Sequence, residues 1–292
     1  MVAREIGGRS TSAIGLGAMH LSIEGRPDER EAIATIHAGL DSGVRLIDTA
    51  DAYSLSDGDF GYSEALVAKA LRSWNGDRSS VIVATKGGHT RVGQGWALNG
   101  RPEYLKEACE ASLRRLGEDE VDLYQFHRPD PDVPFAESIG ALRDLRDAGK
   151  ARMIGVSNVS TEQIEVALAE LGEIAAVQNE FSPTFVSSLS ELEFCSRKGI
   201  AFLSWSPLGG SSEAGSLGGA FATVGAHHGV SAQQVCLAWM IAKSPVLIPV
   251  SGASRPQTIR DSAAASDLVL TAEELAALDA QCGIAPASDS LS

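Results

Sequence analysis

The fold of this chain is decided by the stretch VRLIDTADAY, residues 44–53, in which a short apolar run ends at an ionisable residue, Asp48. Two later stretches repeat this arrangement, since VIVATK ends at Lys86 and VDLYQFH ends at His127. Short apolar runs of this kind are typical of buried parallel strands. We therefore expect three consecutive strands that each place a polar side chain at one common rim, with Tyr53 in the loop beside them.

Apolar runs of this type alternate with amphipathic helix patterns through nearly the whole chain. Such alternation predicts βα units and a parallel sheet. Eight consecutive units over about 250 residues favour an α/β fold of the (β/α)8 TIM-barrel type over a doubly wound open sheet. We therefore treat residues 1–292 as a single barrel domain. The expected strands are 14–18, 44–47, 81–85, 122–126, 151–156, 176–178, 201–204 and 246–248.

Three segments add to the regular repeat. Residues 3–12, with Gly7 and Gly8 at the centre, predict a β-hairpin that covers the N-terminal mouth of the barrel. Two long connections, 87–100 after the third strand and 207–230 after the seventh, leave the C-terminal ends of strands, where barrels carry their active sites. We expect the second connection to move, because it is rich in glycine: Gly209, Gly210, Gly215, Gly218 and Gly219.

Charge and composition exclude several classes of function. The formal net charge of -14 repels a polyanion, so nucleic acid is not an expected partner. The four cysteines lie far apart and form no CxxC pair, which indicates a reducing compartment. No stretch approaches the roughly 18 apolar residues of a membrane helix, and the first residues contain no apolar signal segment. We expect a soluble, cytoplasmic protein.

The four polar residues at the predicted rim each have an ordinary explanation when taken alone, but together they predict carbonyl chemistry. An ammonium lowers the pKa of a nearby phenol, so Lys86 would prepare Tyr53 to donate a proton. A partly buried lysine needs a counter-charge, which Asp48 supplies. A neutral His127 would donate an N–H to a carbonyl oxygen and orient it.

Further motifs extend the pattern along almost the entire chain. DTADAY, Lys86 at a strand end, QFHRPD, IGVSN, the pair Gln178 and Asn179, SWSPLGG and IPVSGASR follow one another in an order that resembles the aldo-keto reductases. The resemblance implies a (β/α)8 barrel that reduces an aldehyde or ketone with NADPH. It gives Tyr53 the role of general acid, and it points to compact bacterial-type members with small or medium substrates, such as pyridoxal reductases.

The resemblance also places the cofactor. Ser157, Asn158 and Gln178 match the partners of the nicotinamide carboxamide, and Trp205 matches the aromatic residue that stacks on its ring. Arg255 follows a strand-end turn and matches a 2′-phosphate ligand, which favours NADPH over NADH because a guanidinium suits phosphate geometry. The complete implied set is Gly17, Ala18, Met19, Asp48, Ser157, Asn158, Gln178, Trp205, Ser206, Leu208, Gly210, Gly252, Ser254, Arg255, Thr258 and Ser262.

Two positions depart from the family pattern at the adenine end. Thr258 stands where relatives often have Gln or Arg, and Ser262 stands where many have the Asn that contacts adenine. Around the reacting carbonyl, the expected substrate-binding residues are Met19, His20, Tyr53, His89, Trp96, His127 and Arg128.

No metal is assigned. The only paired histidines, His227 and His228, are expected in a polar loop with no carboxylate or thiol at metal-ligand spacing, which indicates a solvated pair.

Two other functions stay open. A Schiff-base aldolase on the same barrel would use Lys86 as its nucleophile, although a nucleophilic lysine must be neutral and Asp48 favours the charged form. A non-catalytic nucleotide-binding accessory subunit would bind NADPH without turnover. The physiological substrate and the oligomeric state do not follow from these residues.

Overall fold

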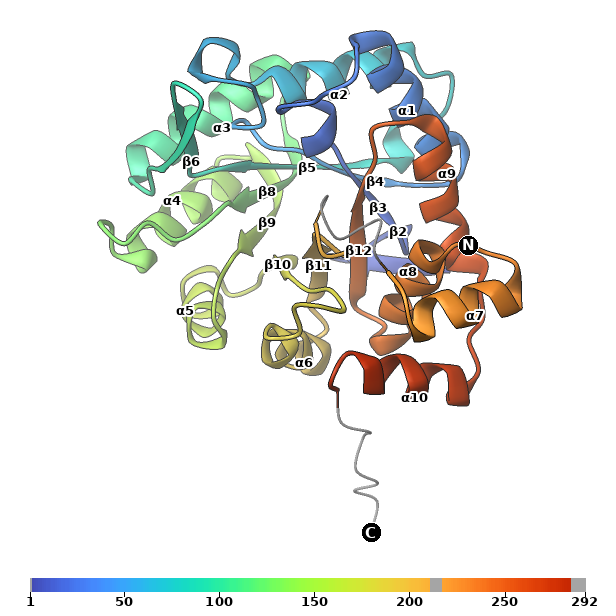
Figure 1. The fold of residues 1–292 in the computed structure, drawn as a ribbon. Coiled ribbons are helices and arrows are strands. Elements are labelled where there is room, and N and C mark those ends of the chain that lie inside the picture. Colours follow the sequence, from blue (N-terminus) through green and yellow to red (C-terminus); the bar gives the residue numbers. More distant parts are fainter. Residues whose placement is uncertain (1, 211–216, 285–292) are drawn as a thin grey trace.

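The chain forms a closed barrel of eight parallel strands with helices outside it, as the sequence predicts (Figure 1). The computed structural model describes residues 2–210 and 217–284. Around the barrel the strands follow one another in chain order, β3-β4-β5-β8-β9-β10-β11-β12, and β12 closes onto β3. Among the described residues, no helix is both long and apolar enough to cross a membrane.

Each barrel strand lies within a few residues of its expected position. The barrel strands are β3 (Gly15–Gly17), β4 (Leu46–Asp48), β5 (Ile82–Gly87), β8 (Val121–Phe126), β9 (Ala151–Ser157), β10 (Ala176–Glu180), β11 (Ala201–Trp205) and β12 (Leu247–Gly252). The helices are α1 (Glu29–Asp41), α2 (Tyr62–Ser73), α3 (Pro102–Leu116), α4 (Phe135–Asp147), α5 (Thr161–Leu171), α6 (Leu189–Lys198), α7 (Ala220–His228), α8 (Ala232–Lys243), α9 (Pro256–Ala264) and α10 (Ala272–Gln281). Short 3-10 turns occupy Met19–Leu21, Asp57–Asp59, Arg78–Ser80 and Ala265–Asp267.

The predicted hairpin β1 (Ala3–Ile6) and β2 (Arg9–Ser12) closes the N-terminal end of the barrel. Its Ile6 is fully buried and packs with the apolar residues that fill the barrel interior. Gly7 and Gly8 both have positive φ, which glycine adopts without steric cost in a tight turn. A side chain at Gly7 would also collide with Met153 of β9, so the turn lies directly against the barrel.

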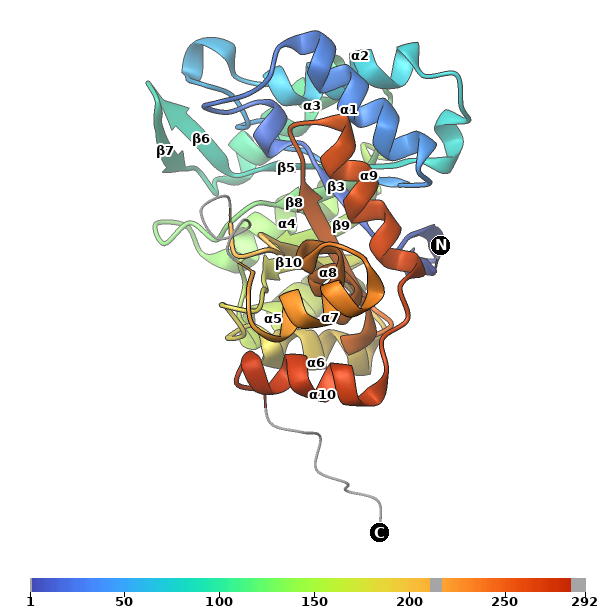
Figure 2. The same cartoon turned by 45° about the vertical axis from the view of Figure 1, so that its right-hand side comes forward.

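The two long connections contain elements of their own. Residues 87–100 include the hairpin β6 (His89–Val92) and β7 (Gly95–Leu98), which projects on the side of the barrel away from the N-terminus (Figure 2). The connection 207–230 is interrupted by the helix α7, which spans Ala220–His228. The predicted movement of this connection stays a prediction, and one of the glycines on which it rests, Gly215, lies outside the described residues.

Strand register explains why the polar residues gather at the C-terminal rim. Asp48 is the last residue of β4 and pairs with Ala84 of β5, two residues before Lys86. The chain beyond β4 continues beside β5, because the amide of Thr49 donates to the carbonyl of Ala84 and that of Asp51 donates to the carbonyl of Lys86. This continuation holds the loop that carries Tyr53 against the same rim.

Candidate active site

A cavity of about 620 Å³ opens at the C-terminal rim, and Tyr53, which lies beside Lys86, is part of its wall. The Lys86 ammonium donates to Asp48 Oδ2 at 2.6 Å and to the carbonyl of Thr49 at 2.9 Å. It also lies 3.3 Å from the Tyr53 hydroxyl oxygen. Lys86 is fully buried behind the cavity wall, whereas Asp48, Tyr53 and His127 line the cavity.

Asp48 is held in place from three directions. Its Oδ2 accepts from Lys86, and its Oδ1 accepts from the side-chain amides of Gln178 at 2.8 Å and Gln125 at 3.3 Å. Burial by itself lowers the pKa of Lys86, but Asp48 and Tyr53 outweigh burial and raise that pKa above its ordinary value. Lys86 is therefore a charged ammonium. Gln125 is a site residue that the sequence argument missed, although it stands inside the QFHRPD motif.

Tyr53 does not have the lowered pKa that the sequence argument expects. Burial raises the pKa of Tyr53, and this effect is larger than the lowering by the nearby Lys86 ammonium. Asp48 and Asp51 raise the pKa further, because negative charges disfavour a phenolate. The hydroxyl of Tyr53 therefore holds its proton firmly, and Lys86 is the group that opposes this tendency.

His127 and His89 form the next part of the cavity wall. Their ring centroids are 4.3 Å apart, and the His127 ring meets the Tyr53 ring edge-on at 5.6 Å. Burial, assisted by Lys86, holds the pKa of His127 well below its ordinary value, and burial lowers the pKa of His89 to about 4. Both imidazoles are neutral near pH 7. Their Nδ1 atoms are buried without a hydrogen-bond partner among the described residues.

Asn158 connects three strand ends at the wall of the cavity. Its backbone has φ +59°, a left-handed conformation that Asn tolerates better than most residues. The side-chain amide donates to the carbonyl of His127, and its oxygen accepts from the Trp205 indole at 3.2 Å and from Arg128 at 3.0 Å. The ends of β8, β9 and β11 are thereby joined beside the cavity.

The cavity brings most of the predicted site residues together. Of the cofactor set, its wall contains Gly17, Met19, Asp48, Ser157, Asn158, Gln178, Trp205, Ser206, Leu208, Gly210, Gly252, Ser254, Arg255 and Thr258. Every expected substrate-binding residue also lines it: Met19, His20, Tyr53, His89, Trp96, His127 and Arg128.

Two predicted cofactor residues are not part of the wall. Ser262 is buried on α9, and its hydroxyl bonds to the Ser251 hydroxyl of β12 at 3.0 Å, so its side chain faces the barrel. Ala18 is fully buried and packs in the apolar layer between strands and helices. Sequence spacing locates both residues near the rim, but it does not show which way a side chain points.

Several wall residues were not predicted, and Glu24 is the most informative. The Glu24 carboxylate lies 3.2 Å from the Arg91 guanidinium, which in turn lies over the Trp96 ring, 3.9 Å from its centroid. Arg91 also donates to the carbonyl oxygens of Ser54 and Leu55, beside Tyr53. The hairpin β6–β7 is thus joined to the loop that carries Tyr53. The other unpredicted wall residues are Gly25, Pro207, Val250 and Ala253.

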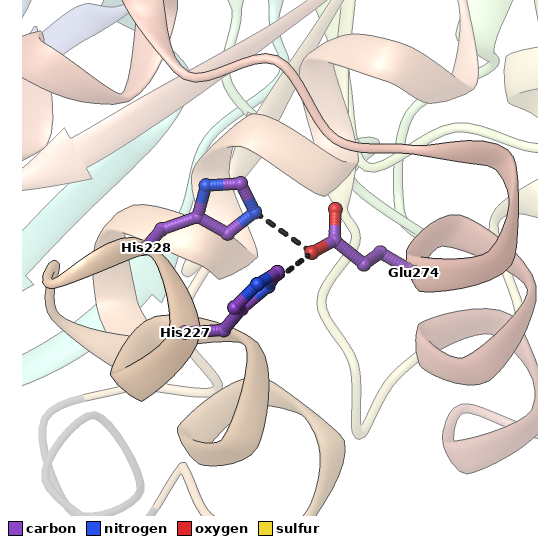
Figure 3. Close-up of side chains that lie close together, drawn as sticks. All are labelled: His227, His228 and Glu274. Carbon is purple, nitrogen blue, oxygen red and sulfur yellow. Dashed lines mark hydrogen bonds and ion pairs between the residues drawn. The ribbon is translucent and has the colours of Figure 1, made fainter.

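The expectation for the paired histidines is wrong in its structural premise. His227 and His228 are the last residues of α7 rather than part of a loop. A carboxylate is also close, because Glu274 Oε1 lies 3.2 Å from His227 Nδ1 and 2.7 Å from His228 Nε2 (Figure 3). Glu274 follows the pair by 46 residues in the chain, so no local spacing rule could associate them.

Comparison with known proteins gives the family. Residues 13–281 match the model of the aldo/keto reductase family. An uncharacterised oxidoreductase from Schizosaccharomyces pombe is 32% identical over 280 residues, which are 94% of this chain and 88% of the relative. A 6-dehydroglucose reductase from Novosphingobium aromaticivorans is 33% identical over 276 residues, which are 90% of this chain and 89% of that protein.

Solved structures agree with this result. A thermostable aldo-keto reductase in complex with the inhibitor epalrestat superposes with a TM-score of 0.82 at 28% identity, covering 96% of this chain and all of the other. An aldo/keto reductase from Klebsiella pneumoniae, in complex with NADP and acetate, gives a TM-score of 0.80 at 28% identity and covers 100% of this chain and 99% of the other. The chain therefore belongs to the aldo/keto reductase family. It is an oxidoreductase, and its general chemistry is carbonyl reduction.

Proposed function

We propose that this protein reduces an aldehyde or ketone to an alcohol with NADPH, and that Tyr53 supplies the proton. The observation that carries the proposal is the contact between a buried, charged Lys86 and the Tyr53 hydroxyl at the cavity wall. As the carbonyl oxygen gains negative charge, it becomes the acceptor for the Tyr53 proton. The Lys86 ammonium stabilises the phenolate that remains, and Asp48 keeps that ammonium charged.

His127 is suited to orient the substrate rather than to protonate it. Its imidazole is neutral, lines the cavity and lies against Tyr53. A neutral imidazole N–H that donates to the carbonyl oxygen stabilises developing negative charge without competing as the acid. Trp96 and His89 meet edge-on at 5.6 Å and form an aromatic wall nearby, which favours a small or medium substrate with an apolar portion.

The cavity also has features that fit a dinucleotide. The Arg255 guanidinium is exposed and has no hydrogen-bond or ion-pair partner among residues 2–210 and 217–284. The nine-residue helix α9 begins after it with no side-chain cap, so the positive end of the helix is available to a phosphate. Ser206 has φ +50°, a strained conformation that is common where backbone borders a ligand. Bound NADPH would supply the hydride that the protein lacks.

A Schiff-base mechanism has less support. Its nucleophile would be a neutral Lys86, whereas Asp48 at 2.6 Å raises the pKa of that lysine. Reduction with borohydride in the presence of substrate distinguishes the mechanisms, because only the aldolase would leave a covalent adduct at Lys86.

The proposal is tested by NADPH oxidation across aldehydes, ketones, quinones and pyridoxal, with wild type and Tyr53→Phe in parallel. We expect the variant to bind NADPH as wild type does and to lose about 10²- to 10⁴-fold in kcat, because the proton donor is gone. Tyr62→Phe is the matched control, since Tyr62 packs under Arg26 outside the cavity wall. Undiminished turnover by Tyr53→Phe contradicts the assignment, and NADPH binding without turnover of any substrate favours an accessory subunit.

A further inference from the structure

The cluster of His227, His228 and Glu274 lies outside the cavity and has no role in the proposed reaction. The two imidazoles leave the last turn of α7, and the carboxylate leaves the first turn of α10 (Figure 3). One carboxylate oxygen, Glu274 Oε1, lies 3.2 Å from His227 Nδ1 and 2.7 Å from His228 Nε2. Within the described part of the chain, this is the one group of three metal-ligating side chains whose ligand atoms converge within 4.8 Å.

The ligand types and separations suit a small divalent transition metal. Imidazole nitrogens and a carboxylate oxygen are common zinc ligands, at bond lengths of about 2.0–2.2 Å. Two ligands at such distances in a tetrahedral site are about 3.3 Å apart. The 3.2 Å separation of Glu274 Oε1 from His227 Nδ1 matches this value, and the 2.7 Å separation from His228 Nε2 is shorter. An ion would replace the two hydrogen bonds that now share Glu274 Oε1, with all three ligand atoms already within 4.8 Å of one another.

The position of Glu274 at the start of α10 fixes the orientation of its carboxylate. Glu274 Oε2 accepts from the backbone amide of Thr271 at 2.8 Å, as the third residue of the capping box that starts α10. Oε2 serves the cap, which leaves Oε1 directed at the imidazoles.

The two helices are also held together at the other end of α7. The Gln281 side chain of α10 accepts from the amide of Ala220 at 2.5 Å and donates to the carbonyl of Gly218 at 3.1 Å. α7 is therefore attached to α10 near both of its ends. This double attachment limits relative movement of the helices, and it places the three ligand atoms together before an ion arrives.

We propose that His227, His228 and Glu274 bind one divalent transition-metal ion, with zinc as the expected ion, and that the ion joins α7 to α10. Water completes the coordination, because the His227 side chain is 78% exposed and that of His228 is 24% exposed. None of the three ligands belongs to the cavity wall, so the ion has a structural role rather than a catalytic one. The sequence argument against a metal was that no carboxylate lies at ligand spacing from the two histidines. In the folded chain, Glu274 supplies that carboxylate.

Calorimetric titration of chelator-treated full-length protein with zinc chloride tests the proposal, with His228→Ala and Glu274→Gln in parallel. We expect about one zinc ion per wild-type chain, at least a tenfold weaker dissociation constant in both variants, and a zinc-dependent rise in Tm for wild type alone. Glu274→Gln retains the cap, because glutamine also serves in a capping box. It therefore separates loss of a ligand from loss of the helix.

Glu273→Gln is the matched control, since it removes the same charge from the adjacent, exposed position and leaves the three ligands intact. It should bind zinc as wild type does. The proposal is overturned if wild type shows no heat of binding up to about 1 mM zinc, which would leave only hydrogen bonds between the helices. It is equally overturned if both ligand variants bind zinc with wild-type affinity. Neither outcome depends on NADPH or on the reductase activity.

Discussion

Lys86 is the residue on which the site depends, because it is fully buried and still carries a charge. The ammonium is compensated by the Asp48 carboxylate and by the carbonyl of Thr49, so most of what it loses in hydration is replaced. Burial alone would lower the pKa of Lys86, which favours the neutral amine, and raise the pKa of Tyr53, which favours the protonated phenol. Asp48 keeps Lys86 charged, and the charge on Lys86 limits the rise in the pKa of Tyr53.

Arg255 provides a test of cofactor preference at the residue scale. We expect Arg255→Ala to raise the dissociation constant of NADPH by at least about tenfold while that of NADH changes little, because only NADPH has a 2′-phosphate. Fluorescence titration with both cofactors measures the difference. Arg260→Ala, on the exposed part of α9, removes the same charge and serves as control. Equal weakening of both cofactors by Arg255→Ala removes the argument for 2′-phosphate recognition.

His89 makes stability depend on pH. Its pKa is about 4 in the folded protein and near 6.5 when unfolded, so the unfolded chain binds the proton more tightly. This contribution to stability is fully present above pH 6.5 and is lost as the pH falls towards 4. Between pH 6.5 and pH 4, we expect wild type to lose on the order of 2–3 kcal/mol more unfolding free energy than His89→Gln loses.

Urea unfolding at several pH values measures this difference. His37→Gln is the control, because His37 lies on α1 outside the cavity. If the pH profile of His89→Gln matches that of wild type over this range, His89 is not the group responsible.

At the scale of elements, a buried ion pair holds α2 and α3 against β5. Glu64 is fully buried on α2, and it accepts from Arg115 of α3 at 2.6 Å and from Thr85 of β5. Arg115→Met would leave the Glu64 carboxylate without its partner. We expect a loss of about 3–5 kcal/mol in unfolding free energy, measured by urea denaturation.

The neighbouring residue supplies the control for this change. Arg114 is exposed on the same helix, so Arg114→Met should alter stability by less than about 0.5 kcal/mol. The double variant Glu64→Gln with Arg115→Met should be more stable than Arg115→Met alone, because it no longer buries an unpaired charge. If Arg115→Met costs no more than Arg114→Met, the pair does not hold these elements.

At the scale of the whole molecule, the two ends of the barrel have different tasks. The C-terminal rim carries the cavity, whereas the N-terminal end is closed by the hairpin β1–β2 through Ile6. Ile6→Ala should lower the unfolding free energy by about 2–5 kcal/mol through loss of buried apolar contacts. KM and kcat of the folded enzyme should stay unchanged, since Ile6 is not part of the cavity wall.

Thermal unfolding and steady-state kinetics on the same samples separate these effects. Val2→Ala is the control, because Val2 is 45% exposed and its truncation should cost little. A changed KM in Ile6→Ala at a temperature where the variant is fully folded would show that the two ends are coupled.

The sequence by itself determined the barrel, the closing hairpin and the residues that meet at the rim. Apolar runs of strand length locate buried strands, and parallel strands in a barrel all end at the same face. A polar residue at the end of each run must therefore lie near the others. This is why Asp48, Lys86 and His127 could be placed together without a structure, along with Tyr53 in the adjoining loop.

Only the tertiary structure decided the features that depend on burial and on contacts between distant segments. The raised pKa of Tyr53 follows from how completely its hydroxyl is removed from water, which no sequence spacing encodes. The side chain of Ser262 turned out to bond to Ser251 instead of facing the cavity. His228 and Glu274 meet because α7 and α10 pack together, and that packing is a property of the whole fold.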